Sequence, residues 1–285
     1  MNRAKIGMLS AMAVFGTVGI FVHYIPLPSA TVAFFRGVLG LLFLLLVSGK
    51  KPGIRQIREK LWLLLLSGGA MGLNWVLLFE SYRYTTVATA TICYYMAPAF
   101  LVLASPLLGE RLTGRNCGLL AVALLGMVFV SGVLNGGFAG GLGIALALGA
   151  AVLYATVMFL NKKMGHIDTY DKSVVQLFAA AVAVLPYVLV TGGFSMGQMT
   201  WVGYLLLAVV GVVHTGVAYW LYFGALGRLP SQTVALFSYL DPVIAIVLSA
   251  LWLKEPLGWQ GILGAVLILG SALLSEIPVK KERKK

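Results

Sequence analysis

The sequence predicts an all-α polytopic membrane protein, with ten transmembrane helices arranged as two inverted five-helix repeats and both termini in the cytoplasm. The first observation is composition: 60% of the 285 residues are hydrophobic and 11% are charged, whereas a soluble domain carries about 25% charged residues. The second is that several apolar stretches run to about 20 residues, the length that spans a bilayer. The third is an internal similarity between the halves. A soluble enzyme, a disordered chain and a disulfide-stapled secreted domain are excluded.

Apolar segments follow one another along the chain, and their short connections leave no room for a folded domain outside the membrane. The first segment imitates a signal peptide, but Pro28 suits the cleavage site poorly, so we expect a retained helix. The expected helices lie at about 5–24, 29–48, 61–83, 87–108, 116–134, 142–161, 173–191, 201–226, 231–253 and 258–276.

Basic residues are distributed unevenly between the two sides of the predicted bundle. With the N-terminus in the cytoplasm, 18 of the 21 lysines and arginines fall on the cytoplasmic side, Arg83 and Lys254 fall outside, and Arg36 lies within a helix. Because such asymmetry orients membrane proteins, the net charge of +12 does not indicate a nucleic-acid partner. We expect a multi-pass protein of a bacterial plasma membrane, without an obligate protein partner, whose basic tail sets orientation or contacts anionic lipids.

The two halves of the chain share residues at a constant spacing. Phe79 and Pro98 lie 19 residues apart, as do Phe223 and Pro242. Other matched residues are Thr89 with Thr233 and Tyr95 with Tyr239, and the acidic hairpins Gly109-Glu110 and Lys254-Glu255 match with a shift of one residue. Because each half holds an odd number of helices, the second half enters the membrane upside down, an arrangement that suits alternating access. The predicted units are a first repeat at 1–134, a linker at 135–141, a second repeat at 142–276 and a tail at 277–285.

Three features carry a resemblance to a known family. They are an arginine early in the second helix (Phe34-Phe35-Arg36-Gly37), a proline in the fourth and ninth helices (Tyr94-Tyr95-Met96-Ala97-Pro98 and Ser238-Tyr239-Leu240-Asp241-Pro242), and a glutamate hairpin after each of those helices. Because of these three features, the chain resembles the ten-helix EamA-type branch of the drug/metabolite transporter superfamily over essentially its whole length. The resemblance implies a secondary transporter, often an exporter of amino acids or other small metabolites, with a substrate cavity between the halves. The second half departs where Gln176 matches Arg36.

Ionisable residues inside predicted helices are candidates for function, because charge at membrane depth is costly and faces the protein interior or a wet cavity. Arg36 can clamp a substrate carboxylate, or it can serve in a structural ion pair. Asp241 can carry a proton, pair with Arg36 in a fixed salt bridge, or balance a cationic substrate. His214 can accept a proton from a gradient, or act as an interhelical hydrogen bonder.

Neutral polar and aromatic residues complete the predicted cavity. Asn74 is expected to line it, and the prolines free the carbonyls of Tyr94 and Ser238 to bind water or substrate, or mark hinges. Aromatic rings at this depth can cage an ammonium group or pack as anchors. The predicted cavity residues are Arg36, Asn74, Tyr94, Tyr95, His214, Trp220, Ser238, Tyr239 and Asp241, with Asp241 and His214 for proton coupling and Pro98 and Pro242 as hinges.

Residues near the helix ends have simpler interpretations. Glu80 and Arg83 are expected to pair with each other or to form an outer gate, and Glu255 is expected to brace its hairpin. Two cysteines, Cys93 and Cys117, lie in apolar stretches and are interpreted as inert buried thiols.

The chemistry missing from the sequence narrows the function. There is no Walker-type loop for ATP, and we predict no catalytic, cofactor-binding or metal-binding residues. We therefore expect a secondary active transporter that exports small amphiphilic metabolites such as amino acids, by alternating access and with proton coupling. An uncoupled facilitator or exchanger and an organic-cation or multidrug exporter of the same fold remain alternatives, as do a membrane-embedded enzyme and an assembly subunit.

Overall fold

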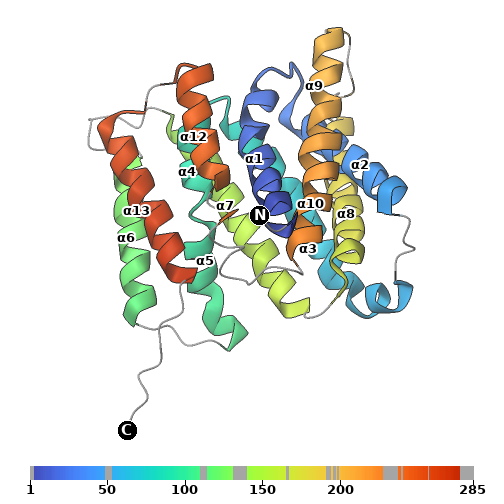
Figure 1. The fold of residues 1–285 in the computed structure, drawn as a ribbon, viewed down its shortest axis with the longest axis horizontal. Helices are drawn as coiled ribbons and strands as arrows, with labels where there is room; N and C mark the ends of the chain where they lie inside the picture. Colours follow the sequence, from blue (N-terminus) through green and yellow to red (C-terminus); the bar gives the residue numbers. More distant parts are fainter. Residues whose placement is uncertain are drawn as a thin grey trace.

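The structure is a computed structural model and describes residues 3–48, 53–109, 114–130, 140–164, 167–190, 194, 197, 199–226, 237–238, 240–255 and 257–276. Every regular element in these segments is helical, as predicted, and Figure 1 shows the helices side by side in one bundle. The elements are α1 (Arg3–His23), α2 (Ser29–Ser48), α3 (Ile54–Ser81), α4 (Val87–Tyr94), α5 (Ala97–Ala104), η1 (Ser105–Leu108), α6 (Gly114–Val130), α7 (Gly141–Met164), α8 (Thr169–Val190), α9 (Trp201–Gly211), η3 (Val212–Val217), α10 (Ala218–Leu226), α12 (Leu240–Trp252) and α13 (Trp259–Glu276).

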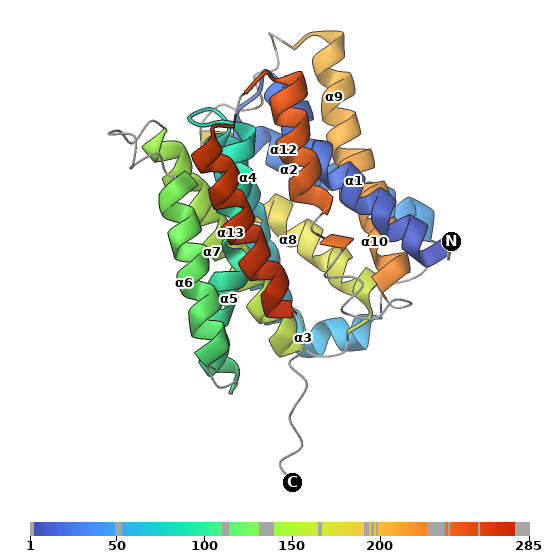
Figure 2. The same cartoon turned by 60° about the vertical axis from the view of Figure 1, so that its left-hand side comes forward.

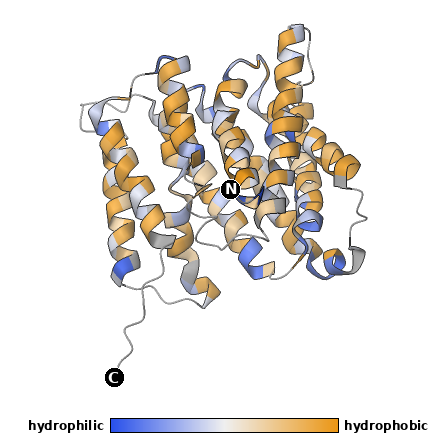
Figure 3. Cartoon of the chain, in the orientation of Figure 1, coloured by the Kyte–Doolittle hydropathy of each residue, from blue (hydrophilic) through white to orange (hydrophobic). Residues whose placement is uncertain are grey.

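The helices have the length and composition of membrane spans. Seven helical stretches in the described segments are long and apolar enough to cross a bilayer, and shorter apolar helices cover Cys117–Val130, Leu240–Trp252 and Trp259–Ser271. Hydrophobic residues cover the sides of the helices, whereas hydrophilic residues gather at the lower ends of α3, α6 and α7 in the view of Figure 3. The chain is therefore a multi-pass integral membrane protein. The count of ten helices and the side of each terminus stay predictions.

Two stretches that the sequence predicts as single helices are interrupted. The helix expected at 87–108 breaks at Tyr95 and Met96, between α4 and α5. Pro98 has no N–H for residue 94, and the Met96 N–H donates to the Cys93 carbonyl at 3.1 Å instead. The helix expected at 201–226 contains η3, a turn of π-helix. In it the Thr215 hydroxyl donates to the Val210 carbonyl at 3.1 Å, a local disturbance typical of functional sites.

The proline of the second half lies near the beginning of the described part of its helix. Pro242 is the third residue of α12, and Phe237 and Ser238, shortly before α12, are helical as well. The segment before it, 227–236, lies outside the described residues, and so does Tyr239.

The contacts between helices repeat from one half to the other. α1 packs against α12 and α10, and in the same way α7 packs against α4, α5 and α3. Likewise α2 of the first half packs on η3, and α8 of the second half packs on α3. Two further contacts join the halves, α6 with α13 and α2 with α8. Figures 1 and 2 both show α6 beside α13 and α1 beside α12. The halves are thus interlocked, because each packs mainly against helices of the other.

Glycines permit the closest of these crossings. A Cβ at Gly72 would lie 2.6 Å from the Ala180 carbonyl oxygen, so α3 and α8 approach to backbone contact. At the matching crossing, a Cβ at Gly40 would lie 2.5 Å from Cγ2 of Thr215, where α2 meets η3. Small residues allow such approach between membrane helices. The second crossing brings Thr215 to the arginine of α2.

Candidate substrate site

Arg36 is buried in the interior of the bundle, where one hydrogen bond joins it to the other described residues. It is 5% exposed, its Nε donates to the Thr215 hydroxyl at 2.9 Å, and its guanidinium lies 4.4 Å above the centre of the Trp75 ring. Its terminal amino groups have no acceptor, and no carboxylate pairs with it, among the described residues. A buried cation without an anion is costly, so the position suits a group that arrives from outside the chain.

Asp241 lies half-buried in the first turn of α12, close to residues of the first half. Its Oδ2 accepts a hydrogen bond from the Tyr95 hydroxyl at 2.9 Å, and that hydroxyl also lies 3.5 Å from the Ser238 carbonyl oxygen. The carbonyl expected to be freed by Pro242 is therefore engaged by Tyr95. The alternative of a fixed Arg36–Asp241 salt bridge is not formed, since these two described side chains make no ion pair.

Asn74 is 1% exposed and connects two helices. Its Nδ2 donates to the Ala150 carbonyl of α7 at 2.5 Å, and its Oδ1 accepts from the Tyr94 hydroxyl at 3.4 Å. The Tyr94 ring stacks on Tyr154 at a centroid distance of 5.2 Å. Tyr94, Tyr95 and Asn74 thus form one group, which reaches Asp241 through Tyr95.

His214 is 2% exposed within η3, and both of its ring nitrogens have oxygen neighbours. Nε2 lies 2.8 Å from the Thr17 hydroxyl, and Nδ1 lies 3.3 Å from the Val209 carbonyl oxygen. The Thr17 hydroxyl is also 2.8 Å from the Val14 carbonyl, so it can donate there and accept from His214, or donate to His214 itself. Either protonation state of the imidazole can therefore be hydrogen-bonded.

Other aromatic residues at this depth are not all brought together. Tyr219 contacts the interior through Met71, with its hydroxyl 3.8 Å from the sulfur. Both Tyr219 and Tyr222 pack edge-on against Phe15. Trp220, by contrast, is 51% exposed on α10 and forms no part of this interior group.

The position that matches Arg36 in the second half is built differently. Gln176 is 7% exposed, and its amide donates to the Ser67 hydroxyl at 2.7 Å and to Asn161 Oδ1 at 3.0 Å. Gln176 of α8 thus meets a hydroxyl of α3 as Arg36 of α2 meets a hydroxyl of η3. Both amide N–H groups of Gln176 therefore have acceptors, whereas the terminal amino groups of Arg36 have none among the described residues.

Several residues of this site could not be found by sequence reasoning. No sequence motif includes Thr215, Trp75 or Thr17, and each is an ordinary residue of an apolar helix. Trp75 follows Asn74 directly and Thr215 follows His214, so adjacency to a predicted polar residue was the one available signal. Tyr154 has no such neighbour and is placed by the packing of α7 on α4.

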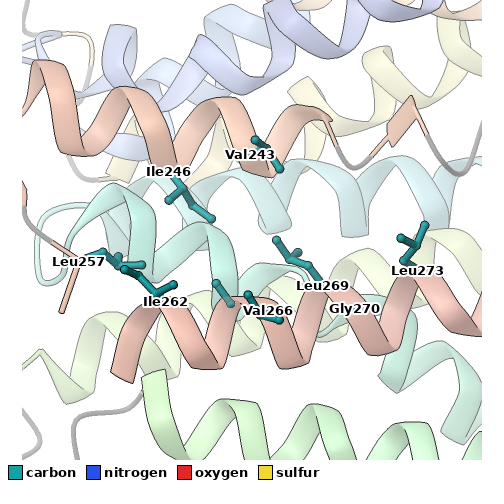
Figure 4. Close-up of a pocket in the computed structure, with 9 residues that line it drawn as sticks. Val243, Ile246, Leu257, Ile262, Val266, Leu269, Gly270 and Leu273 are labelled. Carbon is teal, nitrogen blue, oxygen red and sulfur yellow. The ribbon is translucent and has the colours of Figure 1, made fainter. Parts of the chain in front are cut away.

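A groove between α12 and α13 lies apart from this site. It encloses about 390 Å³ and has a wholly apolar lining (Figure 4). Among its lining residues are Val243, Ile246, Ile262, Val266, Leu269 and Leu273. Its lining offers no polar side chain for a metabolite.

The structure confirms the expected ion pair at the end of α3 and the burial of one of the two cysteines. Glu80 and Arg83 do pair, at 3.3 Å, and Glu80 also accepts from the Ser29 hydroxyl at 2.6 Å. Cys93 is buried as predicted, but Cys117 is exposed. The interpretation of both cysteines as buried thiols is therefore wrong for Cys117, because none of the described helices covers its face of α6.

The interlocked halves and the charged interior define a class of protein, a multi-pass membrane protein built from two repeats. The model of the EamA-like transporter family matches this chain twice, over residues 2–132 and 141–276. The chain therefore belongs to the EamA-like transporter family, and the matches fall one in each half. One solved crystal structure has the same fold, with a TM-score of 0.62 and 20% identity over 95% of this chain and 96% of the other.

Relatives with names come from several bacteria. The uncharacterized transporter YxxF of Bacillus subtilis (strain 168) is 29% identical over 96% of this chain and 89% of its own length. Protein RarD of Streptomyces exfoliatus is 30% identical over 91% of this chain and 85% of its own. A protein of Escherichia coli (strain K12) named "probable amino-acid metabolite efflux pump" is 32% identical over 56% of this chain and 57% of its own.

Proposed function

We propose that this protein is a secondary active transporter that exports small zwitterionic metabolites, amino acids or related compounds, by alternating access with proton coupling. Membership of the family supports transport, and the name of the Escherichia coli relative favours an amino-acid metabolite. The substrate cavity of this proposal contains Arg36, Asn74, Tyr94, Tyr95, Ser238 and Asp241. Two inverted repeats that pack mainly on each other can exchange conformations around such a central site.

One observation carries the proposal: two opposite charges lie inside the bundle without pairing with each other. Arg36 of the first half is held by Thr215 of the second, and Asp241 of the second half is held by Tyr95 of the first. A substrate with both a carboxylate and an ammonium group would satisfy both residues at once. Bidentate binding of the carboxylate by the free side of the guanidinium is the stronger of the two contacts.

Proton coupling is assigned to Asp241, with His214 as a second carrier. The Asp241 carboxylate has one hydrogen-bond donor, Tyr95, among the described residues, which leaves room for a proton or a substrate ammonium to compete for it. His214 has an oxygen at each ring nitrogen and can hold a proton without breaking a contact. Export would then exchange a substrate for a proton at Asp241.

A ligand screen on the purified protein in detergent tests the substrate class. The probes are the twenty amino acids and, for each that stabilises the protein, its methyl ester, which lacks the carboxylate, and its N-acetyl form, which lacks the ammonium. A ligand at 100 times its Kd should add about 2.7 kcal/mol to the free energy of unfolding. We expect the free amino acid to stabilise the protein more than either derivative does.

Matched variants locate the two contacts. Arg36→Gln should abolish the preference for the amino acid over its methyl ester. Asp241→Asn should abolish the preference for the amino acid over its N-acetyl form. Gln176→Ala removes the equivalent side chain of the other half and should leave both preferences unchanged. Stronger stabilisation by the ester than by the amino acid would instead favour an organic-cation exporter, and no response to any amino acid would refute the proposed substrate class.

A further inference from the structure

A carboxylate of the second half lies at the start of a helix of the first half. Glu255, just beyond α12, accepts from the backbone N–H of Val87 at 3.0 Å and from the hydroxyl of Ser249. Val87 is the first residue of α4. The first N–H groups of a helix lack partners within it, and negative charge is favoured there. The bond between Glu255 and Val87 therefore stabilises contact between the two halves.

The backbone before Glu255 directs its side chain. Lys254 has φ 56, and the Glu255 N–H donates to the Ser249 carbonyl at 3.2 Å. This is the bonding of a left-handed helix cap, a place where glycine is usual. In the first half, Gly109 with φ 77 precedes Glu110 in the same way. Ser249 is 0% exposed, and its hydroxyl donates a hydrogen bond to the Glu255 carboxylate.

A second bond ties the same pair of helices together at the opposite end of α4. Tyr95, directly after α4, donates to Asp241 in the first turn of α12. The first half's α4 is thus held to the second half by Glu255 at its start and by Asp241 just past its end. On its other side, α12 lines the apolar groove together with α13.

We propose that Glu255 is a latch: its bond to Val87 locks α4 of the first half against the second half at the predicted outer face, and it must break for the halves to exchange conformations. The residue acts by positioning α4, which leads into Tyr94 and Tyr95. This inference rests on the proposed alternating-access transport. It assigns a step of that cycle to a side chain outside the cavity.

Cys93 provides a built-in reporter for this latch. It is 0% exposed on α4 and packs with Ile144 and Ala147 of α7, in the second half. In a Cys117→Ser background it is the sole thiol, because the chain contains two cysteines. The measurement is the rate at which N-ethylmaleimide modifies Cys93 in protein reconstituted into phosphatidylcholine liposomes, with no substrate added.

Glu255→Ala should raise this rate about tenfold, the effect of removing one charged hydrogen bond from an opening equilibrium. Glu255→Gln should raise it less, since an amide oxygen still accepts. The matched control is Glu80→Ala, which removes a carboxylate bonded to Ser29 and Arg83, all within the first half. It should leave the rate unchanged.

An unchanged rate in folded Glu255→Ala, or an equal rise in Glu80→Ala, would overturn the latch. If the alanine variant does not fold, Glu255→Gln decides: a rise of about threefold supports the latch, and no rise refutes it. Because the labelling rate is measured without substrate, its outcome does not depend on whether the proposed function is correct. A protein that exports amino acids but shows no change in labelling keeps its function and loses the latch.

Discussion

At the scale of single residues, the backbone of Lys254 carries an unfavourable conformation. Its φ of 56 lies in the left-handed region, which costs a non-glycine residue about 1–2 kcal/mol, and its side chain is exposed. Lys254→Gly should therefore raise the free energy of unfolding by about 0.5–1 kcal/mol, after the greater freedom of glycine in the unfolded chain is counted. The melting temperature in detergent measures this. Lys254→Ala keeps the Cβ and should give no gain, so equal melting of both variants would contradict the explanation.

Also at this scale, Asp241 is the residue on which proton coupling depends. Asp241→Asn keeps an oxygen that can accept from Tyr95 but removes the group that binds a proton. We expect liposomes with this variant to lose at least about 90% of the amino-acid efflux driven by a pH gradient, while exchange at equal pH on both sides continues. Efflux that still follows the gradient in the variant would assign the proton to another group, with His214 the next to test.

At the scale of elements, the crossing of α3 and α8 depends on Gly72. An alanine Cβ there would lie 2.6 Å from the Ala180 carbonyl oxygen and 2.9 Å from its Cα. Because backbone atoms cannot rotate away, the helices must separate, and Gly72→Ala should lower stability by about 2 kcal/mol. The control is Gly118→Ala in α6, where the new Cβ meets open space beyond the backbone of its own helix and stability should hold or rise. Equal melting of the two variants would show that the crossing tolerates a wider spacing.

At the scale of the whole molecule, the distribution of basic residues predicts which face meets the cytoplasm. Lys162 and Lys254 are both exposed, and the sequence assigns them to opposite sides. In a Cys117→Ser background, Lys254→Cys should react with a membrane-impermeant maleimide on intact cells, and Lys162→Cys only after permeabilisation. Labelling of both, or the reverse order, would invalidate the predicted orientation of the two repeats.

The sequence by itself determined the membrane class, the helical fold, the division into two similar halves and the family. Each follows from composition, from apolar stretches whose length matches a bilayer, or from residues repeated at one spacing. Arg36, Asp241 and Asn74 could be selected because polar groups are rare at membrane depth and their burial needs a reason. The pairing of Glu80 with Arg83 also followed from sequence, since residues three apart on a helix are neighbours.

Only the tertiary structure decided which of these residues meet. It separated Arg36 from Asp241, joined Arg36 to Thr215 and Asp241 to Tyr95, and put Trp220 at the surface. It also carried Glu255 to the start of α4, 168 residues away in the chain. Contacts of this kind depend on how helices from opposite halves cross, and those crossings are set by backbone approach at glycines such as Gly72 and Gly40. Apolar helices of similar composition can pack in many ways, so no pattern along one chain selects among them.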